Sequence, residues 1–426
     1  MKIQKILKRL LQLHPKSIDL SLSRIKRLLK DLNNPEKKIK NVIQVVGTNG
    51  KFSVCSSLRE IFETAGYSVN MNISPSLRKF NERYYFSGKY ISDEELYDLL
   101  IEVEKINKNQ NITFHEFICA CFFLASARKK SDINILESGL FFRLDASNVL
   151  EKNIASIIMP IGIDHKDFLK KGTIDEIVYE KCSKLLNDSK IIVSEQKNET
   201  LIKIKENIYK NTSKKYFFGK DYSYKKNSKG FTYSDKKGII NLPSPNLLGD
   251  FQISNVSTAI NTARNLDQFK ITESNIKQAI IKIRSEGRLQ LIKQGKLKKL
   301  ISKGNEILID GAHNPLAALV VNKFLKNFYS RKKIIMVLGM MANKEHKKFI
   351  EIFKSNVHSI VALDIPNQVN FIKKEKLSQI VKSCGIPVIT EDSIEAAFKN
   401  FGRENSDALI LCTGSLYFSG EILNLN

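Results

Sequence analysis

The segment 47–53, with the sequence GTNGKFS, carries the residue types of a phosphate-binding loop. It follows the apolar run Val42–Val46 and precedes a helical pattern over 53–65. Glycines let backbone N–H groups turn toward an anion, a helix N-terminus adds partial positive charge, and Lys51 can meet the outer phosphates. The segment departs from the complete pattern of G-x-x-x-x-G-K followed by Ser or Thr. An ordinary turn between strand and helix is the alternative, and the combination of features favours phosphate binding.

Two further polar groups follow predicted strands. Glu137 ends the run 133–136, and the tetrapeptide GIDH at 162–165 follows the run 154–161. A carboxylate at the carboxyl end of a strand suits a Mg²⁺ ligand, although it could simply mark the strand end. His165 could be a metal ligand, a base or a hydrogen-bonded structural histidine. Three polar groups that follow three adjacent predicted strands favour one shared functional site over three unrelated occurrences.

The segment 310–315, DGAHNP, is a fourth candidate because it follows the predicted strand 307–309. It could be only a turn that caps the next helix. Ligands of open α/β sheets bind outside the carboxyl ends of the strands. We therefore expect this segment to be part of a site that faces the first domain.

The elements that would position these groups are short β-branched runs alternating with longer helical patterns. Such alternation indicates a mostly parallel sheet covered by helices. Ser92 with Glu95 and Thr173 with Glu176 match the capping box that starts a helix. Further strands are expected at 334–338, 359–363, 388–389 and 408–411, and helices at 114–128 and 252–266.

The rhythm of strands and helices breaks at 212–247, which we expect to be a hairpin-rich excursion, and it restarts after residue 287. We therefore expect an α/β protein of two domains. A P-loop-type, mostly parallel sheet domain would occupy 1–286 and carry the phosphate-binding loop. A smaller Rossmann-like α/β domain would occupy 287–426.

The charge of the chain is high but does not define a nucleic-acid-binding protein. The 426 residues include 69 Lys+Arg and 44 Asp+Glu, which gives a net charge of +25. That balance invites a nucleic-acid interpretation. Most of the basic residues, however, are lysines spread over the whole chain, and no RNA-recognition motif is present. We expect a dispersed, solvated lysine surface and no nucleic-acid partner.

Apolar runs and cysteines exclude two other classes. The longest apolar run, 117–127, is too short to span a bilayer. Six cysteines without a Cys-x-x-Cys pair indicate neither a disulfide scaffold nor a zinc site. The basic N-terminus lacks the features of a signal peptide, and we expect an ordinary helix with Ile3, Ile6, Leu7 and Leu10 inward. The protein is expected to be cytoplasmic, with no membrane partner.

Taken together, these residues resemble the folylpolyglutamate synthase / dihydrofolate synthase family of the Mur ligase superfamily. The resemblance covers nearly the whole chain, and the order and number of its motifs argue against chance. The motifs are HPKSIDLSL at 14–22, GTNGK at 47–51, SPSL at 74–77, FNER at 80–83, RLDASN at 143–148, GIDH at 162–165, EK at 180–181, GRL at 287–289, DGAHNP at 310–315 and GSLY at 414–417.

The resemblance implies an ADP-forming ligase that joins L-glutamate to the carboxylate of a folate or dihydropteroate. The carboxylate would first take the γ-phosphate of ATP to form an acyl phosphate, and the glutamate amine would then displace phosphate. The implied cofactors are ATP and Mg²⁺, and the implied partners are small-molecule substrates. We expect a monomer.

The resemblance also implies roles for individual residues. Lys51, His165 and Lys181 would be catalytic, and Lys181 matches a lysine that the family carries as a carbamate. A solvated helix lysine is the alternative for Lys181. Nucleotide contacts are implied for Thr48, Asn49, Gly50, Lys51, Ser53, Asn255, Arg288, Asp310 and His313. Ser74, Glu137 and His165 would hold Mg²⁺. Substrate contacts are implied for Phe80, Asn81, Glu82, Arg83, Arg143 and Asp145.

The chain departs from the family pattern at several positions. Phe141 and Phe142 replace a pair of glycines, and if that turn needs positive φ each Phe costs about 1–2 kcal/mol. The other departures are Phe52, Ser76, Cys182, Phe251 and Glu286. They leave the expected phosphate and metal side chains in place. We expect them to affect folate affinity and turnover more than the class of reaction.

Two other functions are alternatives to this one. A peptidoglycan-precursor ligase needs a separate N-terminal nucleotide-sugar domain, and residues 1–46 are too few for one. A degenerate, non-catalytic relative that binds nucleotide or folate is motivated by the phenylalanine substitutions. The retained Lys51, Glu137, His165 and Lys181 argue against it. The choice between dihydropteroate, folates or both stays open.

Overall fold

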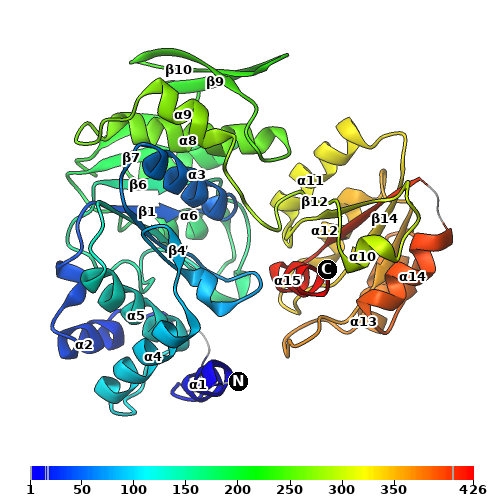
Figure 1. The fold of residues 1–426 in the computed structure, drawn as a ribbon, viewed down its shortest axis with the longest axis horizontal. Coiled ribbons are helices and arrows are strands. Elements are labelled where there is room, and N and C mark those ends of the chain that lie inside the picture. The colour runs from blue at the N-terminus through cyan, green and yellow to red at the C-terminus, as the bar shows by residue number, and fades with distance from the viewer. Residues whose placement is uncertain (1, 15, 17–18, 405–406) are drawn as a thin grey trace. The chain divides into compact units, whose positions relative to one another are not determined.

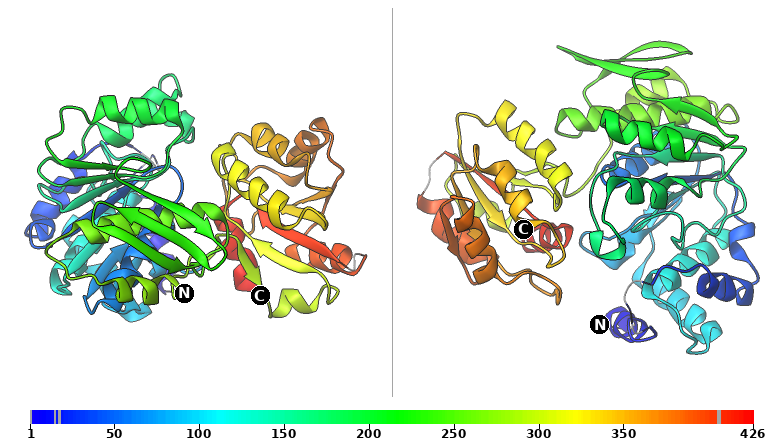
Figure 2. Two further views of the ribbon diagram at one scale, coloured as in Figure 1. Left: turned by 90° about the horizontal axis from the view of Figure 1, so that it is seen from above. Right: turned by 180° about the vertical axis from the view of Figure 1, so that it is seen from behind.

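The computed structural model describes residues 2–14, 16, 19–404 and 407–426, and it divides the chain into two compact units (Figures 1 and 2). Unit 1 comprises Met1–Ile161, Thr173–Asn246 and Ile253–Arg284. Unit 2 comprises Gly162–Gly172, Leu247–Gln252 and Ser285–Asn426. Pro15, Ser17 and Ile18 of the motif at 14–22 lie outside the described residues.

Unit 1 is built on an eight-stranded sheet with the order β4-β3-β2-β5-β1-β6-β7-β8. Every neighbouring pair from β2 to β8 is parallel, and β3 and β4 add an antiparallel edge. The strands are β1 Val42–Val46, β2 Val69–Asn72, β3 Tyr84–Phe86, β4 Lys89–Tyr90, β5 Ile133–Glu137, β6 Ala155–Ile158, β7 Lys190–Val193 and β8 Lys214–Phe217. β1 and β5 are buried along their whole length, as expected of central parallel strands.

Four helices of unit 1, α4 (Asp93–Asn107), α5 (Phe114–Arg128), α6 (Ile174–Cys182) and α9 (Glu273–Ile280), begin at capping boxes. The capping boxes predicted at Ser92 and Thr173 are confirmed, and each hydroxyl accepts a hydrogen bond from the backbone N–H three residues on. The N-terminal helix buries Ile6 and Leu10, as predicted. The other helices are α1 Lys2–Leu10, α2 Ser23–Asp31, α3 Lys51–Thr64, α7 Asn198–Asn207 and α8 Asp250–Asn265, with short 3-10 turns η1 Pro35–Lys37 and η2 Phe80–Arg83. The 3-10 turn η3 (Lys166–Phe168) and the first residues of α8 belong to the segments of unit 2.

The segment 212–247 is only partly the excursion that the sequence predicted. The strands β9 (Tyr222–Asn227), β10 (Gly230–Asp235) and β11 (Gly238–Pro243) form a separate antiparallel meander. β8, however, pairs in parallel with β7 and extends the main sheet, so the expectation was wrong for residues 214–217. The four-residue strand is half exposed at the edge of the sheet, which leaves little apolar pattern to reveal it.

Unit 2 contains a six-stranded sheet with the order β12-β13-β17-β14-β15-β16, parallel except for β12. Successive side chains of a strand point to opposite faces. Leu308, Met336 and Leu411 accordingly belong to one buried core, and Ile307, Val337 and Ile410 to another. The elements are β12 Gln290–Ile292, α10 Lys296–Lys299, β13 Glu306–Ile309, α11 Pro315–Phe328, β14 Lys333–Leu338, α12 His346–Phe353, β15 Ser359–Ala362, α13 Lys374–Ser383, β16 Val388–Thr390, α14 Ile394–Glu404, β17 Ala408–Thr413 and α15 Leu416–Leu425.

Two layered α/β units with mostly parallel sheets confirm the predicted fold class. Among the described residues, no helix combines the length and apolar character that crossing a membrane requires. All six cysteines are buried and unpaired, as expected of a chain that does not depend on disulfides.

Candidate active site

The carboxyl ends of three adjacent strands carry the predicted chemistry of unit 1. β5, β1 and β6 are neighbours in the sheet, so the predicted adjacency is confirmed. Glu137 is the last residue of β5, and the glycine-bearing loop follows β1 directly. The segment after β6, 162–172, packs with unit 2 and carries His165 with it.

Both glycines of the loop are required by its geometry. Gly47 and Gly50 have positive φ, at 153° and 81°. A Cβ on Gly47 would lie 2.7 Å from the Cβ of Met159, and a Cβ on Gly50 would lie 2.8 Å from the amide oxygen of Asn255. The loop is therefore pressed against the end of β6 on one side and the buried Asn255 of α8 on the other.

The loop amides divide into two sets. The N–H groups of Thr48 and Asn49 donate to the carbonyl oxygen of Pro160, at 2.9 and 3.2 Å, and so fasten the loop to the sheet. α3 begins at Lys51, two residues earlier than the sequence pattern suggested. The first N–H groups of a helix have no partner within it. The anion donors that this geometry offers are therefore the amides of Gly50, Lys51 and Phe52.

Lys51 lies back over the loop. Its Nζ donates to the carbonyl oxygens of Gly47 and Thr48, both at 3.3 Å, and lies 3.9 Å from Oε1 of Glu137. An ammonium between a helix N-terminus and a carboxylate can bridge an anion and a metal-binding group. This is the arrangement that phosphate binding with a nearby cation requires.

Glu137 and Ser74 meet at the strand end. Glu137 is 5% exposed, and its Oε2 accepts a hydrogen bond from the backbone N–H of Ser74 at 3.1 Å. The hydroxyl of Ser74 accepts one from Arg83 at 3.2 Å. The described residues hold no group of three or more His, Cys, Asp or Glu that could ligate a metal. Mg²⁺ does not need one, since it takes one or two carboxylates with waters and substrate phosphates. The oxygen donors of Ser74 and Glu137 therefore fit Mg²⁺.

Lys181 is buried against the same loop, so the alternative of a solvated helix lysine is wrong. The side chain is 3% exposed on α6. Its Nζ donates to the carbonyl oxygens of Gly47 at 2.9 Å and Leu140 at 3.0 Å, and lies 5.5 Å from the ring centre of Phe141. A buried ammonium is stable only with such partners.

The expected strain at Phe141 and Phe142 does not arise, because neither residue adopts positive φ. Both side chains are buried in unit 1. The backbone N–H groups of Phe142 and Arg143 donate to the carbonyl oxygen of Glu180 at 3.0 and 2.8 Å. The pair thus joins the segment after β5 to α6, next to Lys181.

The predicted substrate residues fall into two groups. The side chains of Asn81 and Glu82 form hydrogen bonds with residues close to them in the sequence. The amide of Asn81 donates to Asp93 and to the carbonyl of Ile91, and Glu82 accepts from the backbone N–H groups of residues 77–79. Phe80 and Arg83 stack on one another, 5.1 Å from the ring centre to the guanidinium. All four residues are partly exposed.

Arg143 and Asp145 are also engaged by the protein. Arg143 forms a bidentate ion pair with Glu180, with N–O distances from 2.8 to 3.1 Å. Oδ1 of Asp145 accepts from the backbone and hydroxyl of Ser147, and Oδ2 accepts from the backbone N–H of Gly139 at 3.1 Å. Asp145 is fully enclosed, so direct contact with a substrate would need some of these bonds to be exchanged.

His115 is a member of this cluster that sequence reasoning missed. Its Nε2 lies 3.3 Å from Oδ2 of Asp145 and 3.8 Å from Sγ of Cys119. Burial alone lowers the pKa of His115, but Cys119 and the Asp145 carboxylate raise it well above its ordinary value. His115 lies in the first turn of its helix, where a protonated histidine would be unfavourable because the helix dipole is positive there. A carboxylate nearby offsets this effect, so the position of His115 is the one feature of the sequence that points to such a partner.

In unit 2, Asp310 follows β13 and organises its own loop. Its carboxylate accepts from the backbone N–H groups of Leu289 at 2.9 Å and Ala312 at 2.8 Å. Burial raises its pKa, and the nearby Arg288 opposes that rise in part. A Cβ on Gly311 would lie 2.8 Å from Nη1 of Arg288, so the guanidinium crosses that glycine closely. Asn314 caps α11 by accepting from Ala317, which confirms the helix-cap interpretation of this segment.

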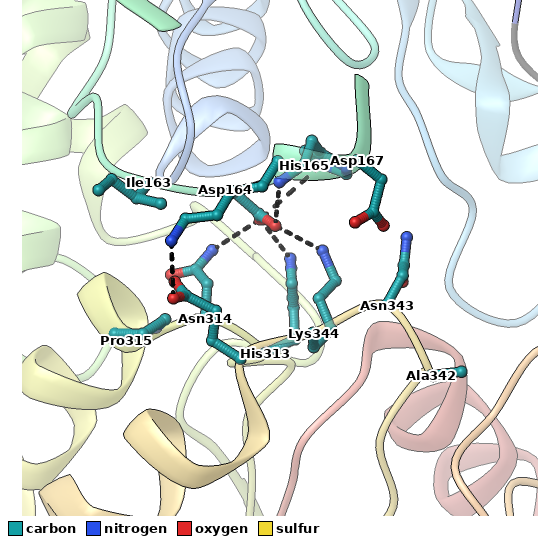
Figure 3. Close-up of a pocket in the computed structure, with 12 residues that line it drawn as sticks. Ile163, Asp164, His165, Asp167, His313, Asn314, Pro315, Ala342, Asn343 and Lys344 are labelled. Carbon is teal, nitrogen blue, oxygen red and sulfur yellow. Dashed lines mark hydrogen bonds and ion pairs between the residues drawn. The ribbon is translucent and has the colours of Figure 1, made fainter. Parts of the chain in front are cut away.

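A polar cavity of about 210 Å³ opens beside this loop, entirely within unit 2 (Figure 3). Three segments line it, and the residues are Ile163, Asp164, His165, Lys166, Asp167, His313, Asn314, Pro315, Ala342, Asn343, Lys344 and Glu345. The predicted residues His165 and His313 are thus brought together. Lys344 was not among the predicted site residues, because it lies outside all of the motifs described above.

Asp164 is the centre of the cavity wall (Figure 3). Its carboxylate contacts Lys344 Nζ at 2.7 Å, Asn314 Nδ2 at 3.1 Å and His313 Nε2 at 3.4 Å. Burial alone would raise the pKa of Asp164, but His313, His165 and Lys344 outweigh it and hold the pKa far below its ordinary value. Asp164 is therefore an ionised carboxylate.

Comparisons with known proteins agree with this geometry. The Mur ligase middle domain matches residues 45–263, more than half of the chain, and the Mur ligase glutamate ligase domain matches 287–416. The chain therefore belongs to the Mur ligase family.

Named relatives narrow the similarity within that family. The dihydrofolate synthase/folylpolyglutamate synthase of Bacillus subtilis (strain 168) is 27% identical over 94% of this chain and 94% of its own length. The resemblance to the folylpolyglutamate synthase / dihydrofolate synthase family predicted from the motifs is thereby confirmed.

Solved structures share the fold over almost the whole chain. E. coli FolC in complex with DHPP and ADP covers 99% of this chain and 97% of its own, with a TM-score of 0.88 and 24% identity. The bifunctional enzyme of Yersinia pestis CO92, complexed with AMPPNP and Mn ion, covers 99% and 97%, with a TM-score of 0.86 and 22% identity. At these identities the likeness shows the fold.

Proposed function

We infer that the protein is an ADP-forming ligase that joins L-glutamate to the carboxylate of a folate or dihydropteroate. The observation that carries this inference is the convergence of Lys51, Lys181 and Glu137 on the loop that begins at Gly47. Two cationic side chains and one carboxylate around a helix N-terminus suit a transferring phosphoryl group and its metal ion. The named relatives catalyse reactions of this class according to their names, and the ligands of the two solved structures are adenine nucleotides, DHPP and Mn ion.

We propose that the loop and Lys51 bind the phosphates of ATP. The amides of residues 50–52 would donate to phosphate oxygens, and Lys51 would leave its carbonyl partners to neutralise charge on the γ-phosphate. Thr48, Asn49 and Ser53 keep their proposed roles beside the phosphates. Asn255 would keep Gly50 in place. Ser74 and Glu137 would hold Mg²⁺, which supplies charge neutralisation on the phosphates when bound. The assignment of His165 as a further ligand stays a prediction, since His165 belongs to unit 2.

The reaction then needs two bond exchanges. A carboxylate oxygen of the acid substrate bonds to the γ-phosphorus as the bond to ADP breaks, which gives an acyl phosphate. The uncharged amine of glutamate next bonds to the acyl carbon, phosphate leaves with the C–O bond pair, and the nitrogen loses one proton. Lys51 is the group best placed to stabilise both phosphoryl species, since it lies at the helix N-terminus throughout.

We propose that the polar cavity of unit 2 receives L-glutamate. Lys344 supplies N–H donors for a carboxylate of glutamate. The cavity, at about 210 Å³, is smaller than the roughly 300–1,000 Å³ of pockets that hold drug-sized ligands. Its size and charge pattern suit a small zwitterion.

The remaining site residues keep their proposed roles. Arg288, Asp310 and His313 would contact the nucleotide, and Phe80 with Arg83 would contact the folate. Lys181, carbamylated or not, would act on the phosphate side through its contact with the loop. The protein is proposed to be a cytoplasmic monomer. The non-catalytic alternative loses its main support, because the phenylalanine pair at 141–142 is unstrained.

The test of this function is direct. The purified chain is mixed with ATP, Mg²⁺ and labelled L-glutamate, together with either dihydropteroate or tetrahydrofolate. ATP-dependent incorporation of label with one or both acids is expected, with ADP released in equal amount. Folded protein that incorporates no label with either acid refutes the function. The comparison of the two acids decides which of the two synthase activities the chain has.

A further inference from the structure

The cavity of unit 2 depends on one carboxylate that no part of the reaction uses. Asp164 is 7% exposed and Lys344 is 8% exposed, and their side chains form an ion pair at 2.7 Å. A nearly buried ammonium whose partner is removed is strongly destabilised. The place of Lys344 in the cavity is therefore conditional on Asp164.

Asp164 joins three segments that are far apart in the sequence. Its Oδ1 accepts from the backbone N–H of His165 at 2.8 Å and from Lys344, which follows β14. Its Oδ2 accepts from Asn314, whose own oxygen caps α11. Figure 3 shows these groups pointing at the one carboxylate from different sides of the cavity.

The same carboxylate orients His313. Nδ1 of His313 lies 2.8 Å from the carbonyl oxygen of Gly311, which directs Nε2 toward Oδ2 of Asp164 at 3.4 Å. The ring is thus held at both nitrogens. Lys344 keeps two of its three N–H donors for another acceptor, since Asp164 occupies one.

We propose that Asp164 is a positioning residue for the amino-acid substrate. It holds the ammonium of Lys344 where a carboxylate of glutamate would meet it and fixes the ring of His313 in the cavity wall, without contacting the substrate itself. This inference rests on the proposed function of the cavity. A group that acts by holding a binding group in place changes substrate affinity first and the chemical step second.

The test is a comparison of Asp164→Asn with Asp167→Asn in the full-length protein. Each variant removes one negative charge from the same segment of the cavity lining. Asp167, however, is exposed and is bonded to neither Lys344 nor His313. Asp164→Asn is expected to raise the KM for L-glutamate at least about tenfold, because one partner of a buried pair is lost. The KM for ATP should change less than about threefold, and Asp167→Asn should change both constants less than about twofold.

A double-mutant cycle with Lys344→Met separates positioning from folding. If Asp164 acts through Lys344, adding Asp164→Asn to Lys344→Met should raise the KM for glutamate much less than it does in the wild type. The double variant also removes both charges, so it keeps the test available if Asp164→Asn alone does not fold. Thermal unfolding of each variant is measured alongside, since a merely structural role lowers stability and leaves the KM unchanged.

Four outcomes would count against the inference. An unchanged KM for glutamate in folded Asp164→Asn overturns it, and so does an equal rise in Asp167→Asn. If the fold-increases in the KM for glutamate caused by Asp164→Asn and by Lys344→Met simply multiply in the double variant, the inference is also overturned. Wild-type protein that ligates no glutamate at all overturns the proposed function and this inference with it. An active wild type with an unaltered Asp164→Asn removes the inference alone.

Discussion

The ammonium of Lys181 donates a hydrogen bond to the carbonyl oxygen of Gly47 at 2.9 Å, across 134 positions of sequence. The contact ties α6 to the first residue of the phosphate-binding loop. It places a buried positive charge where the loop turns away from β1. The loop and α6 are therefore one functional unit, although nothing in either segment alone shows it.

Replacement of Lys181 should affect both stability and turnover. Lys181→Met leaves the carbonyl oxygens of Gly47 and Leu140 without their donor, which should lower the free energy of unfolding by about 1–3 kcal/mol. Ligase turnover should fall with it, as measured by labelled-glutamate incorporation. Lys184→Met is the matched control, because Lys184 is exposed just beyond the same helix. Small carboxylates should partly restore activity to Lys181→Ala if the native lysine is carbamylated, and equal activities of the Lys181 and Lys184 variants would contradict the assignment.

Glu137→Gln tests the metal assignment. The variant keeps the shape of the side chain but removes the charge that faces Lys51 and that Mg²⁺ would meet. Turnover should fall by about 10²–10³-fold, and half-saturation should require more Mg²⁺. The readout is ATP-dependent glutamate incorporation across a range of Mg²⁺ concentrations. Glu151→Gln, at a side chain that is 73% exposed, is the control. A Mg²⁺ dependence equal to that of the wild type would refute the role of Glu137.

The phenylalanine pair should be necessary for stability. Phe141→Gly or Phe142→Gly would restore the family residue, yet each removes a fully buried ring from unit 1. Loss of such a ring should destabilise the protein by about 3–5 kcal/mol. The urea midpoint of unit 1, followed by circular dichroism, provides the measurement. Tyr209→Ala, at a residue 82% exposed, should hardly change it. A stabilising effect of either glycine would show that the backbone is strained after all.

Stability should depend on pH through His115 and Asp145. The pKa of His115 is raised in the folded protein, so its contribution is complete below the unfolded value of about 6.5 and is lost as pH rises through the folded value. Burial alone raises the pKa of Asp145, but His115 and Ser147 lower it, so its contribution is present above about 3.9 and is lost in acid. The pair should therefore stabilise most between these limits.

The measurement for this pair is urea unfolding of the wild type and His115→Phe at several pH values. The advantage of the wild type over the variant should shrink as pH rises above about 6.5. Only the change of this stability difference with pH is informative, because the phenylalanine changes packing equally at every pH. A difference that stays constant from mildly acidic to alkaline pH would show that the histidine does not interact with Asp145 as an ion pair.

Local patterns determined a large part of this protein from the sequence alone. The capping boxes at Ser92 and Thr173, the strand Val42–Val46 and the glycine-bearing loop depend on residues within a few positions of one another. Propensity, capping and periodicity act over that range, so they are readable without coordinates. The order of the motifs then identified the family.

Only the tertiary structure decided which of these residues meet. The burial of Lys181 against Gly47, the pairing of His115 with Asp145 and the convergence on Asp164 all join segments that are distant in sequence. β8 entered the main sheet, and the segment 162–172 packed with unit 2, for the same reason. Such contacts are set by how helices and strands pack to bury apolar surface, and the spacing of residues along a chain does not contain that information.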